Sequence, residues 1–110
     1  MTIDCVQVGG KVVLRVVGRM DVDSAPQFLL ACESYLSDEV TTLVLDLADL
    51  TYISSMGLRS VVTIAKKLKE NGGELRICRL TGLVRQVFEI TRMTQLFALH
   101  DSVESALLEG

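Results

Sequence analysis

A change of hydrophobic period divides residues 42–73 into a predicted strand, a polar turn and a predicted helix. Residues 43–47 form a nearly continuous apolar run, which is typical of a strand covered on both faces. Beyond the turn, apolar positions recur three or four residues apart and so lie on one stripe of a helix; they are Leu58, Val61, Val62, Ala65 and Leu68. Gly72-Gly73 predicts the end of this helix, because glycine tolerates the left-handed turn there. We expect the stripe to be buried against a sheet.

The residues before this stretch predict a hairpin followed by a helix. Residues 3–8 and 11–17 are rich in β-branched side chains and are separated by Gly9-Gly10, a two-residue turn that suits a hairpin. The more mixed pattern of residues 3–8 predicts a sheet edge. Residues 24–27 predict a helix start with a Ser24 hydroxyl cap and a proline in the first turn. The predicted buried positions of that helix are Ala25, Phe28, Leu29, Cys32 and Leu36.

The last third of the chain predicts a strand, a helix, a short strand and a final helix. Residues 74–80 alternate as a strand does, and a short strand is expected between 93 and 99. Thr81 predicts a cap for a helix over 82–91, and residues 101–104 predict a second cap. The apolar face of the first of these helices is predicted to consist of Leu83, Val84, Val87 and Phe88.

The order of these elements predicts the fold class. Helices that connect successive strands require parallel pairing, whereas the initial hairpin requires one antiparallel pair. We therefore predict an α/β fold, a mixed sheet of four to five strands with flanking helices and an antiparallel hairpin at its edge. Residues 1–110 are expected to form a single domain, since this length supports one core.

Composition narrows the classes of function. The chain is 49% apolar but only 5% aromatic, which predicts an aliphatic core. A net charge of −3 argues against a nucleic-acid partner, since such proteins usually carry a clustered basic face. No apolar run approaches 18 residues and the start lacks a signal-peptide pattern, so we expect a soluble, cytoplasmic protein without a membrane partner. The three cysteines have no short paired spacing and are expected to be buried thiols rather than metal or redox groups.

The chain lacks the residue sets of common catalytic sites. Ser54 and Ser55 have no histidine nearby in the sequence, because the only histidine is His100. Ile53 occupies the first glycine position of a Gly-x-Ser-x-Gly elbow, and no phosphate loop is present. Asp21, Asp46 and Asp49 suggest a magnesium site of the receiver type, but Leu80-Thr81-Gly82 stands where its lysine is expected. We expect neither catalysis nor a metal or cofactor.

The serine pair has two interpretations from its position alone. A serine at a helix start is a preferred cap, and an exposed serine there is also a site for phosphorylation. The helical wheel places Met56 on the polar arc together with Arg59, Ser60 and Thr63, opposite the buried stripe. A flexible apolar side chain on such an arc favours a contact surface. Asp21 and Asp23 either support their loop and the following helix start or contact a partner.

Residues 45–58, Leu-Asp-Leu-Ala-Asp-Leu-Thr-Tyr-Ile-Ser-Ser-Met-Gly-Leu, closely resemble the signature of STAS domains, specifically the bacterial anti-sigma-factor antagonists. In that family, a strand ending in aspartate is followed by an aromatic–aliphatic pair and by Asp-Ser-(Ser/Thr/Ala)-Gly-Leu at a helix start. Anchoring on Gly57-Leu58 matches Ser55 to the phosphorylated serine of the family. Ser54 departs from the pattern, which has aspartate there, so Ser54 stays an alternative phosphoacceptor. The predicted elements extend the resemblance to the STAS fold over essentially the whole chain.

The resemblance implies a partner-switching function. The unphosphorylated protein would bind an anti-sigma factor with a serine-kinase ATPase fold and so free the sigma factor. That kinase would phosphorylate Ser55 and break the complex, and a metal-dependent serine phosphatase would restore it. The implied and inferred partner-binding residues are Asp21, Asp23, Ser24, Ser54, Met56, Gly57, Arg59, Ser60 and Thr63.

Two alternatives remain open from the sequence. One is a STAS domain that is never phosphorylated and serves as a scaffold in a signalling assembly or beside a lipid-transport ATPase. The other is a receiver-like domain that accepts phosphate on Asp46. The kind of phosphate found on the protein distinguishes the three hypotheses. Stable phosphoserine indicates the partner switch, acid-labile acyl phosphate the receiver-like domain, and no phosphate the scaffold.

Overall fold

The computed structural model describes residues 1–37 and 39–108. In chain order its elements are β1 (Thr2–Val8), β2 (Lys11–Met20), α1 (Ala25–Glu33), β3 (Thr42–Asp46), β4 (Leu50–Ile53), α2 (Ser55–Glu70), β5 (Glu74–Cys78), α3 (Gly82–Ile90), the 3-10 helix η1 (Met93–Gln95), β6 (Ala98–His100) and α4 (Val103–Leu108).

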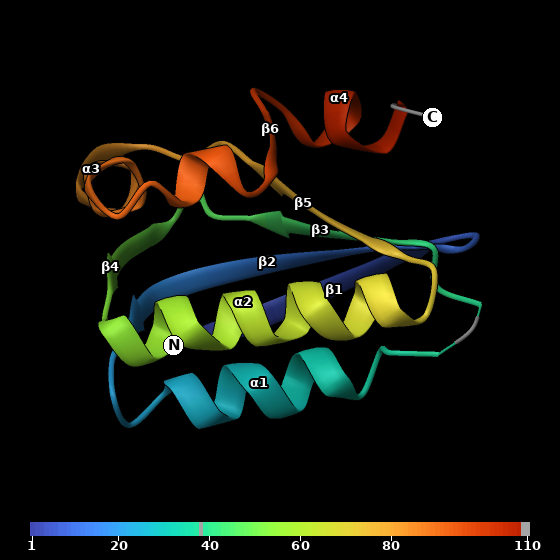
Figure 1. Ribbon diagram of the computed structural model, residues 1–110, viewed down its shortest axis with the longest axis horizontal. Coiled ribbons are helices and arrows are strands. Elements are labelled where there is room, and N and C mark those ends of the chain that lie inside the picture. Colours follow the sequence, from blue (N-terminus) through green and yellow to red (C-terminus); the bar gives the residue numbers. More distant parts are fainter. Residues whose placement is uncertain (38, 109–110) are drawn as a thin grey trace.

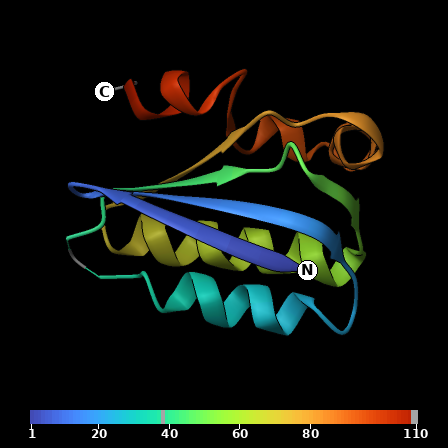
Figure 2. The ribbon, with the colours of Figure 1, turned by 180° about the vertical axis from the view of Figure 1, so that it is seen from behind.

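The strands form a mixed sheet with helices on both faces. Its order is β1-β2-β3-β5-β6, and β4 pairs with β2 off this path. β1 is antiparallel to β2, and every other pair is parallel. Helices α1 and α2 lie side by side on one face, and α4 lies over the other (Figure 1). Seen from behind, β1 runs along the open edge of the sheet (Figure 2). The predicted mixed sheet with a hairpin edge is confirmed, and the residues that the structure describes form six strands instead of four to five.

Two glycines make the hairpin possible for different reasons. Val8 pairs with Lys11, so Gly9 and Gly10 alone form the turn. Gly9 has a φ of +61°, in the left-handed region that favours glycine. At Gly10 an added Cβ would lie 2.9 Å from the carbonyl oxygen of Glu39. The turn therefore also packs against the loop that leads into β3.

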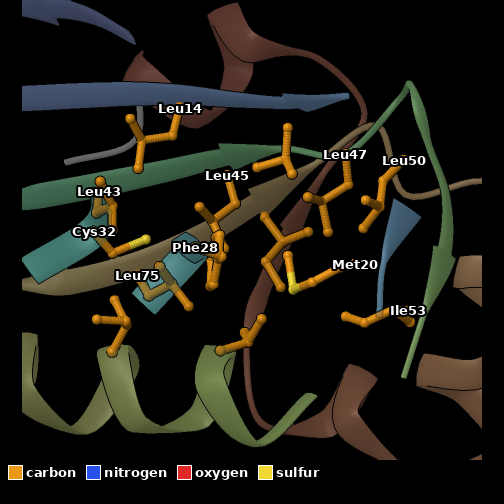
Figure 3. Close-up of a cluster of buried hydrophobic side chains, with 14 of the residues drawn as sticks. Leu14, Met20, Phe28, Cys32, Leu43, Leu45, Leu47, Leu50, Ile53 and Leu75 are labelled. Carbon is orange, nitrogen blue, oxygen red and sulfur yellow. The ribbon is translucent and has the colours of Figure 1, made fainter. Parts of the chain in front are cut away.

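The main core lies between the sheet and the α1–α2 layer. Val12, Leu14 and Val16 alternate along β2 and are all fully buried, as are Phe28 and Cys32 of α1. Figure 3 shows Phe28 and Cys32 close to the leucines of β3. Burying each large aliphatic or aromatic side chain contributes about 1.5–3 kcal/mol. A smaller cluster of Val13, Val44, Cys78 and Ala106 lies on the other face, where α4 packs.

The polar turn predicted between β3 and α2 is wrong, because part of it forms β4. Gly18 pairs with Leu50, Arg19 with Tyr52, and Met20 with Ile53, with a register shift after Gly18. β2 has ten residues and β3 only five, so the end of β2 would lack a partner without β4. The strand supplies the backbone hydrogen bonds that a buried segment needs.

The predicted face of α2 is also partly wrong. Ile64, absent from the predicted stripe, is fully buried, and Ser60 is only 7% exposed although it was placed on the polar arc. Val62 and Ala65 are half-buried instead of buried. α2 packs against α1 as well as against the sheet, and Lys67 Nζ lies 2.5 Å from Glu33 Oε2 across that contact. Packing against α1 therefore turns the buried face of α2 away from Val62.

Smaller expectations also differ from the structure. Leu29 and Leu36 are half-buried instead of buried, and α1 ends at Glu33, before Leu36. Ser24 and Thr81 precede their helices without making a side-chain cap hydrogen bond. Leu83 is exposed, and so is Cys5, which the sequence predicted to be a buried thiol. The cap predicted at residues 101–104 does form, because Ser102 Oγ accepts a hydrogen bond from the backbone N–H of Ser105 at 3.0 Å.

Candidate functional site

Ser54 and Ser55 occupy different environments although they are neighbours. Ser54 is the N-cap of α2, and its Oγ accepts a hydrogen bond from the backbone N–H of Gly57 at 3.1 Å. Its side chain is buried. Ser55 is the first residue of α2 and is exposed, and its hydroxyl makes no hydrogen bond within the described residues. Capping satisfies one of the free N–H groups at a helix start, so the Ser54 oxygen is engaged while the Ser55 oxygen faces solvent.

Gly57 allows the start of α2 to approach the ends of β2 and β4 closely. A Cβ on Gly57 would lie 2.8 Å from Ile53 Cγ1 and 2.9 Å from Met20 Sδ. Contacts this short do not occur between real side chains, so only glycine fits without a shift. The glycine in the signature therefore sets the position of the serine pair relative to the sheet.

Gly57→Ala is expected to lower the free energy of unfolding by up to about 2 kcal/mol. Overpacking costs about 1–3 kcal/mol, and the higher helix propensity of alanine returns up to about 1 kcal/mol. Urea denaturation measures the change, and Ser55→Ala is the matched control because residue 55 is exposed in the same turn. If Gly57→Ala were more stable than wild type by about 1 kcal/mol, the full gain in helix propensity, the close approach would have no energetic consequence.

The loop between β2 and α1 lies beside the serine pair. The backbone N–H of Ser54 donates to the carbonyl oxygen of Met20 at 2.8 Å, which joins the start of α2 to the end of β2. Asp21 Oδ1 accepts from the N–H groups of Asp23 and Ser24 at 3.0 and 2.9 Å. Ser24 Oγ in turn accepts from the Asp21 N–H at 2.8 Å. Asp21 and Ser24 thus hold the loop in shape, while Asp23 is exposed.

These hydrogen bonds also affect the ionisation of the Asp21 carboxyl. The backbone N–H and hydroxyl of Ser24 lower the pKa of the Asp21 carboxyl, because both favour its ionised form. Asp21 therefore stays negatively charged at neutral pH. Of the two interpretations that the sequence left open, the structural one describes the contacts of Asp21, and Asp23 is the aspartate that faces solvent.

Two apolar side chains are exposed in the first turn of α2 and in the loop that is hydrogen-bonded to its start. Met56 is 41% exposed in the first turn of α2, as the helical wheel predicted, and Val22 is 62% exposed in the adjoining loop. Sequence reasoning missed Val22, and the signal was an apolar residue between two loop aspartates. Arg59 is exposed and Thr63 is half-buried on the same side of α2. Of the predicted contact residues, Ser54, Gly57 and Ser60 are buried and offer almost no side-chain surface.

A buried carboxylate at the end of β3, that of Asp46, is paired with the exposed side chain of Arg79. Arg79 Nε and Nη2 lie 3.0 and 2.6 Å from the two carboxylate oxygens of Asp46, which is only 3% exposed. Sequence reasoning looked for this cation at Leu80-Thr81-Gly82 and missed it one residue earlier. Arg79 reaches Asp46 from a backbone with a φ of +56°. Both oxygens of Asp46 are thus engaged, which argues against its use as a phosphoacceptor.

The other candidate groups for chemistry are held apart from the serine pair. Asp49 forms an exposed ion pair with Arg15. His100 lies in β6, with its Nδ1 3.2 Å from Ser105 Oγ, so it is not a base for either serine. Within residues 1–37 and 39–108, no three His, Cys, Asp or Glu side chains are grouped to hold a metal ion. No helix in that part of the chain is long and apolar enough to cross a membrane.

Comparison of the sequence with known proteins finds the same family that the signature around Gly57 resembles. The STAS domain model matches residues 2–106. The anti-sigma-B factor antagonist of Listeria monocytogenes is 33% identical over 95 residues, which cover 86% of this chain and 78% of that protein. BtrV of Bordetella bronchiseptica, named for a proposed role as an anti-sigma factor antagonist, is 48% identical over 64 residues. That match covers 58% of this chain but only 55% of the length of BtrV.

Solved structures agree on the fold. Bacillus SpoIIAA, an anti-sigma factor antagonist, superposes with a TM-score of 0.84 in its unphosphorylated form and 0.76 in its phosphorylated form. The two superpositions each cover 96% of this chain, and 93% and 96% of the SpoIIAA chains, at 20% and 18% identity. At these identities the likeness shows the fold alone. The family model, the Listeria relative and the shared fold together show that this chain belongs to the STAS domain family of anti-sigma-factor antagonists.

Proposed function

We propose that this protein is an anti-sigma-factor antagonist that works by partner switching. Its unphosphorylated form binds an anti-sigma factor with a serine-kinase ATPase fold, which releases the sigma factor. The kinase phosphorylates Ser55 and breaks the complex, and a metal-dependent serine phosphatase restores the binding form. The names of the relatives and the existence of a phosphorylated SpoIIAA structure support this proposal.

The observation that carries the proposal is the division of roles between the two serines. Ser54 keeps the helix start capped, so the Ser55 hydroxyl is exposed and available for transfer of a phosphoryl group. A kinase needs this access, and modifying Ser55 leaves the Ser54–Gly57 hydrogen bond in place. Phosphorylation of Ser54 would instead require loss of the cap, which typically costs about 1 kcal/mol.

The change of charge explains how the switch operates without unfolding the domain. A phosphoryl group adds about −1.5 to −2 charges at neutral pH. At the first residue of α2 the helix dipole and the free N–H groups favour that charge. In a complex that covers the exposed apolar side chains of Met56 and Val22, however, the same charge would lose its contact with water. Burying a charge without a partner is costly, so the modified protein dissociates.

Phosphopeptide mapping with the cognate kinase and ATP tests the proposal. The kinase is first identified by mass spectrometry of a pull-down from the native host. Ser55→Ala is expected to lose phosphate incorporation and to keep partner binding. Ser55→Asp is expected to stay folded and to bind at least tenfold more weakly, about 1.4 kcal/mol, although one carboxylate carries less charge than a phosphate.

Ser54→Ala is the matched control. It removes a hydroxyl from the adjacent position and the helix cap, and it is expected still to accept phosphate. Phosphate retained in Ser55→Ala and lost in Ser54→Ala would move the site by one residue. An unphosphorylated wild type that still binds its partner would exclude the switch and favour a scaffold STAS domain.

A further inference from the structure

An open groove runs along α2 on the side that faces β6, and it is mainly apolar at its Val62 end and mixed toward Glu74. It consists of two adjoining hollows of about 280 and 240 Å³ that share Ala65, Lys69, Leu96 and Phe97. Val62 and Lys66 complete one hollow, and the other continues over Leu75 to Ala98. From residue 62 to residue 69, α2 rises about 10 Å, or two helical turns.

The groove exposes apolar surface that the fold itself does not cover. Val62 and Ala65 belong to the apolar stripe of α2, yet they are only half-buried because the buried face is turned toward α1. Leu96 is 66% exposed on the opposite wall, beside the half-buried Phe97. Among residues 1–37 and 39–108, β6 is the last strand of the sheet on this side, and no further strand covers the wall. Contiguous exposed apolar surface with a charged rim is typical of a docking site.

The charged side chains on the rim of the groove indicate which charge a partner would carry. Lys66 and Lys69 are exposed, and neither makes an ion pair within the described residues. Lys67, which lies between them in sequence, is paired with Glu33 on the other side of α2. Glu74 also lines the groove, but its carboxylate is paired with Arg76. The free charges along the groove are therefore positive.

We propose that this groove binds an acidic amphipathic helix of a partner protein. Apolar side chains of that helix at positions i, i+3, i+4 and i+7 fill the hollows over Ala65 and Phe97, and its carboxylates lie against Lys66 and Lys69. A helix fits better than an added strand, because β6 has only three residues and offers few backbone hydrogen bonds. The site is separate from the proposed function of Ser55 and does not depend on it.

Distance separates the groove from the Ser55 surface. Ala65 lies ten residues beyond Ser55 on one helix, a rise of about 15 Å. Charges on the surface are screened over about 8 Å at physiological ionic strength. Docking in the groove is therefore expected to be independent of a negative charge at residue 55.

Fluorescence anisotropy with two labelled synthetic helices tests the proposal. Both carry leucines at i, i+3, i+4 and i+7, and one has glutamates and the other lysines at the flanking positions. The acidic helix is expected to bind the wild-type protein saturably, and the basic helix at least tenfold more weakly. Binding of the acidic helix should fall at least tenfold in Lys66→Glu/Lys69→Glu and also in Leu96→Asp.

The controls separate the groove from the rest of α2. Ser55→Asp and Arg59→Glu change exposed positions of the same helix and are expected to change the affinity less than twofold. Residues 66, 69 and 96 are exposed, so circular dichroism is expected to show folded variants; if Leu96→Asp fails to fold, the lysine pair decides. Equal binding of the acidic and basic helices, or an affinity unchanged by the lysine reversal, would overturn the proposal. So would saturable binding of dodecanoate in the groove together with no binding of either helix.

Discussion

Ile64→Asp is expected to lower the free energy of unfolding by several kcal/mol, a large part of the stability of an ordinary domain. Ile64 lies on the buried face of α2 and is fully buried in the main core. Aspartate there removes an aliphatic side chain and places a carboxylate among buried hydrophobic side chains. The combined loss is several kcal/mol, out of a total stability of about 5–15 kcal/mol for an ordinary domain. Urea denaturation followed by circular dichroism measures it.

The neighbours of Ile64 provide the control. Val62 and Thr63 are half-buried, so an aspartate at either position keeps contact with water. We expect Val62→Asp and Thr63→Asp to destabilise the domain far less than Ile64→Asp. Equal destabilisation by Val62→Asp and Ile64→Asp would contradict the half-buried position of Val62. It would favour the sequence prediction, which placed Val62 in the buried stripe of α2.

The three cysteines are expected to differ by at least a hundredfold in their rate of reaction with a thiol reagent at pH 8. Cys5 is exposed on the edge strand, whereas Cys32 and Cys78 are buried. Burial raises the pKa of Cys32 to about 12 and that of Cys78 to about 11, from 9.0 for a free thiol. The thiolate is the reactive species. The higher pKa therefore lowers the thiolate population of Cys32 about a thousandfold and that of Cys78 about a hundredfold.

Labelling with a chromogenic disulfide should therefore release one equivalent quickly and two more only when the protein unfolds. Cys5→Ser should lose the fast phase and keep the slow one. Two fast equivalents in the wild type would contradict the burial of Cys32 or Cys78. Because the fold raises both pKa values above that of a free thiol, ionisation at high pH favours the unfolded chain. The stabilisation linked to these thiols is present below pH 9 and declines as the pH rises toward 12.

Local patterns in the sequence were sufficient for most of the architecture. The shift from an apolar run at residues 43–47 to a helical period predicted β3 and α2, and the Gly9-Gly10 turn predicted the hairpin. The crossover rule then predicted parallel strands beyond the hairpin. These features depend on residues a few positions apart, so the sequence carries them directly. The signature around Gly57 identified the family for the same reason.

Contacts between distant segments decided what the sequence left open or predicted wrongly. Which side of α2 is buried depends on α1, whose Glu33 meets Lys67 across 34 residues of sequence. The partner of Asp46 is Arg79, which only the parallel pairing of β3 with β5 brings close. The loop that carries the exposed Val22 is joined to the start of α2 because Met20 accepts a hydrogen bond from Ser54. Hydrophobic period records that a side chain is apolar, but burial requires a neighbour, and tertiary packing leaves Val62 facing an open groove.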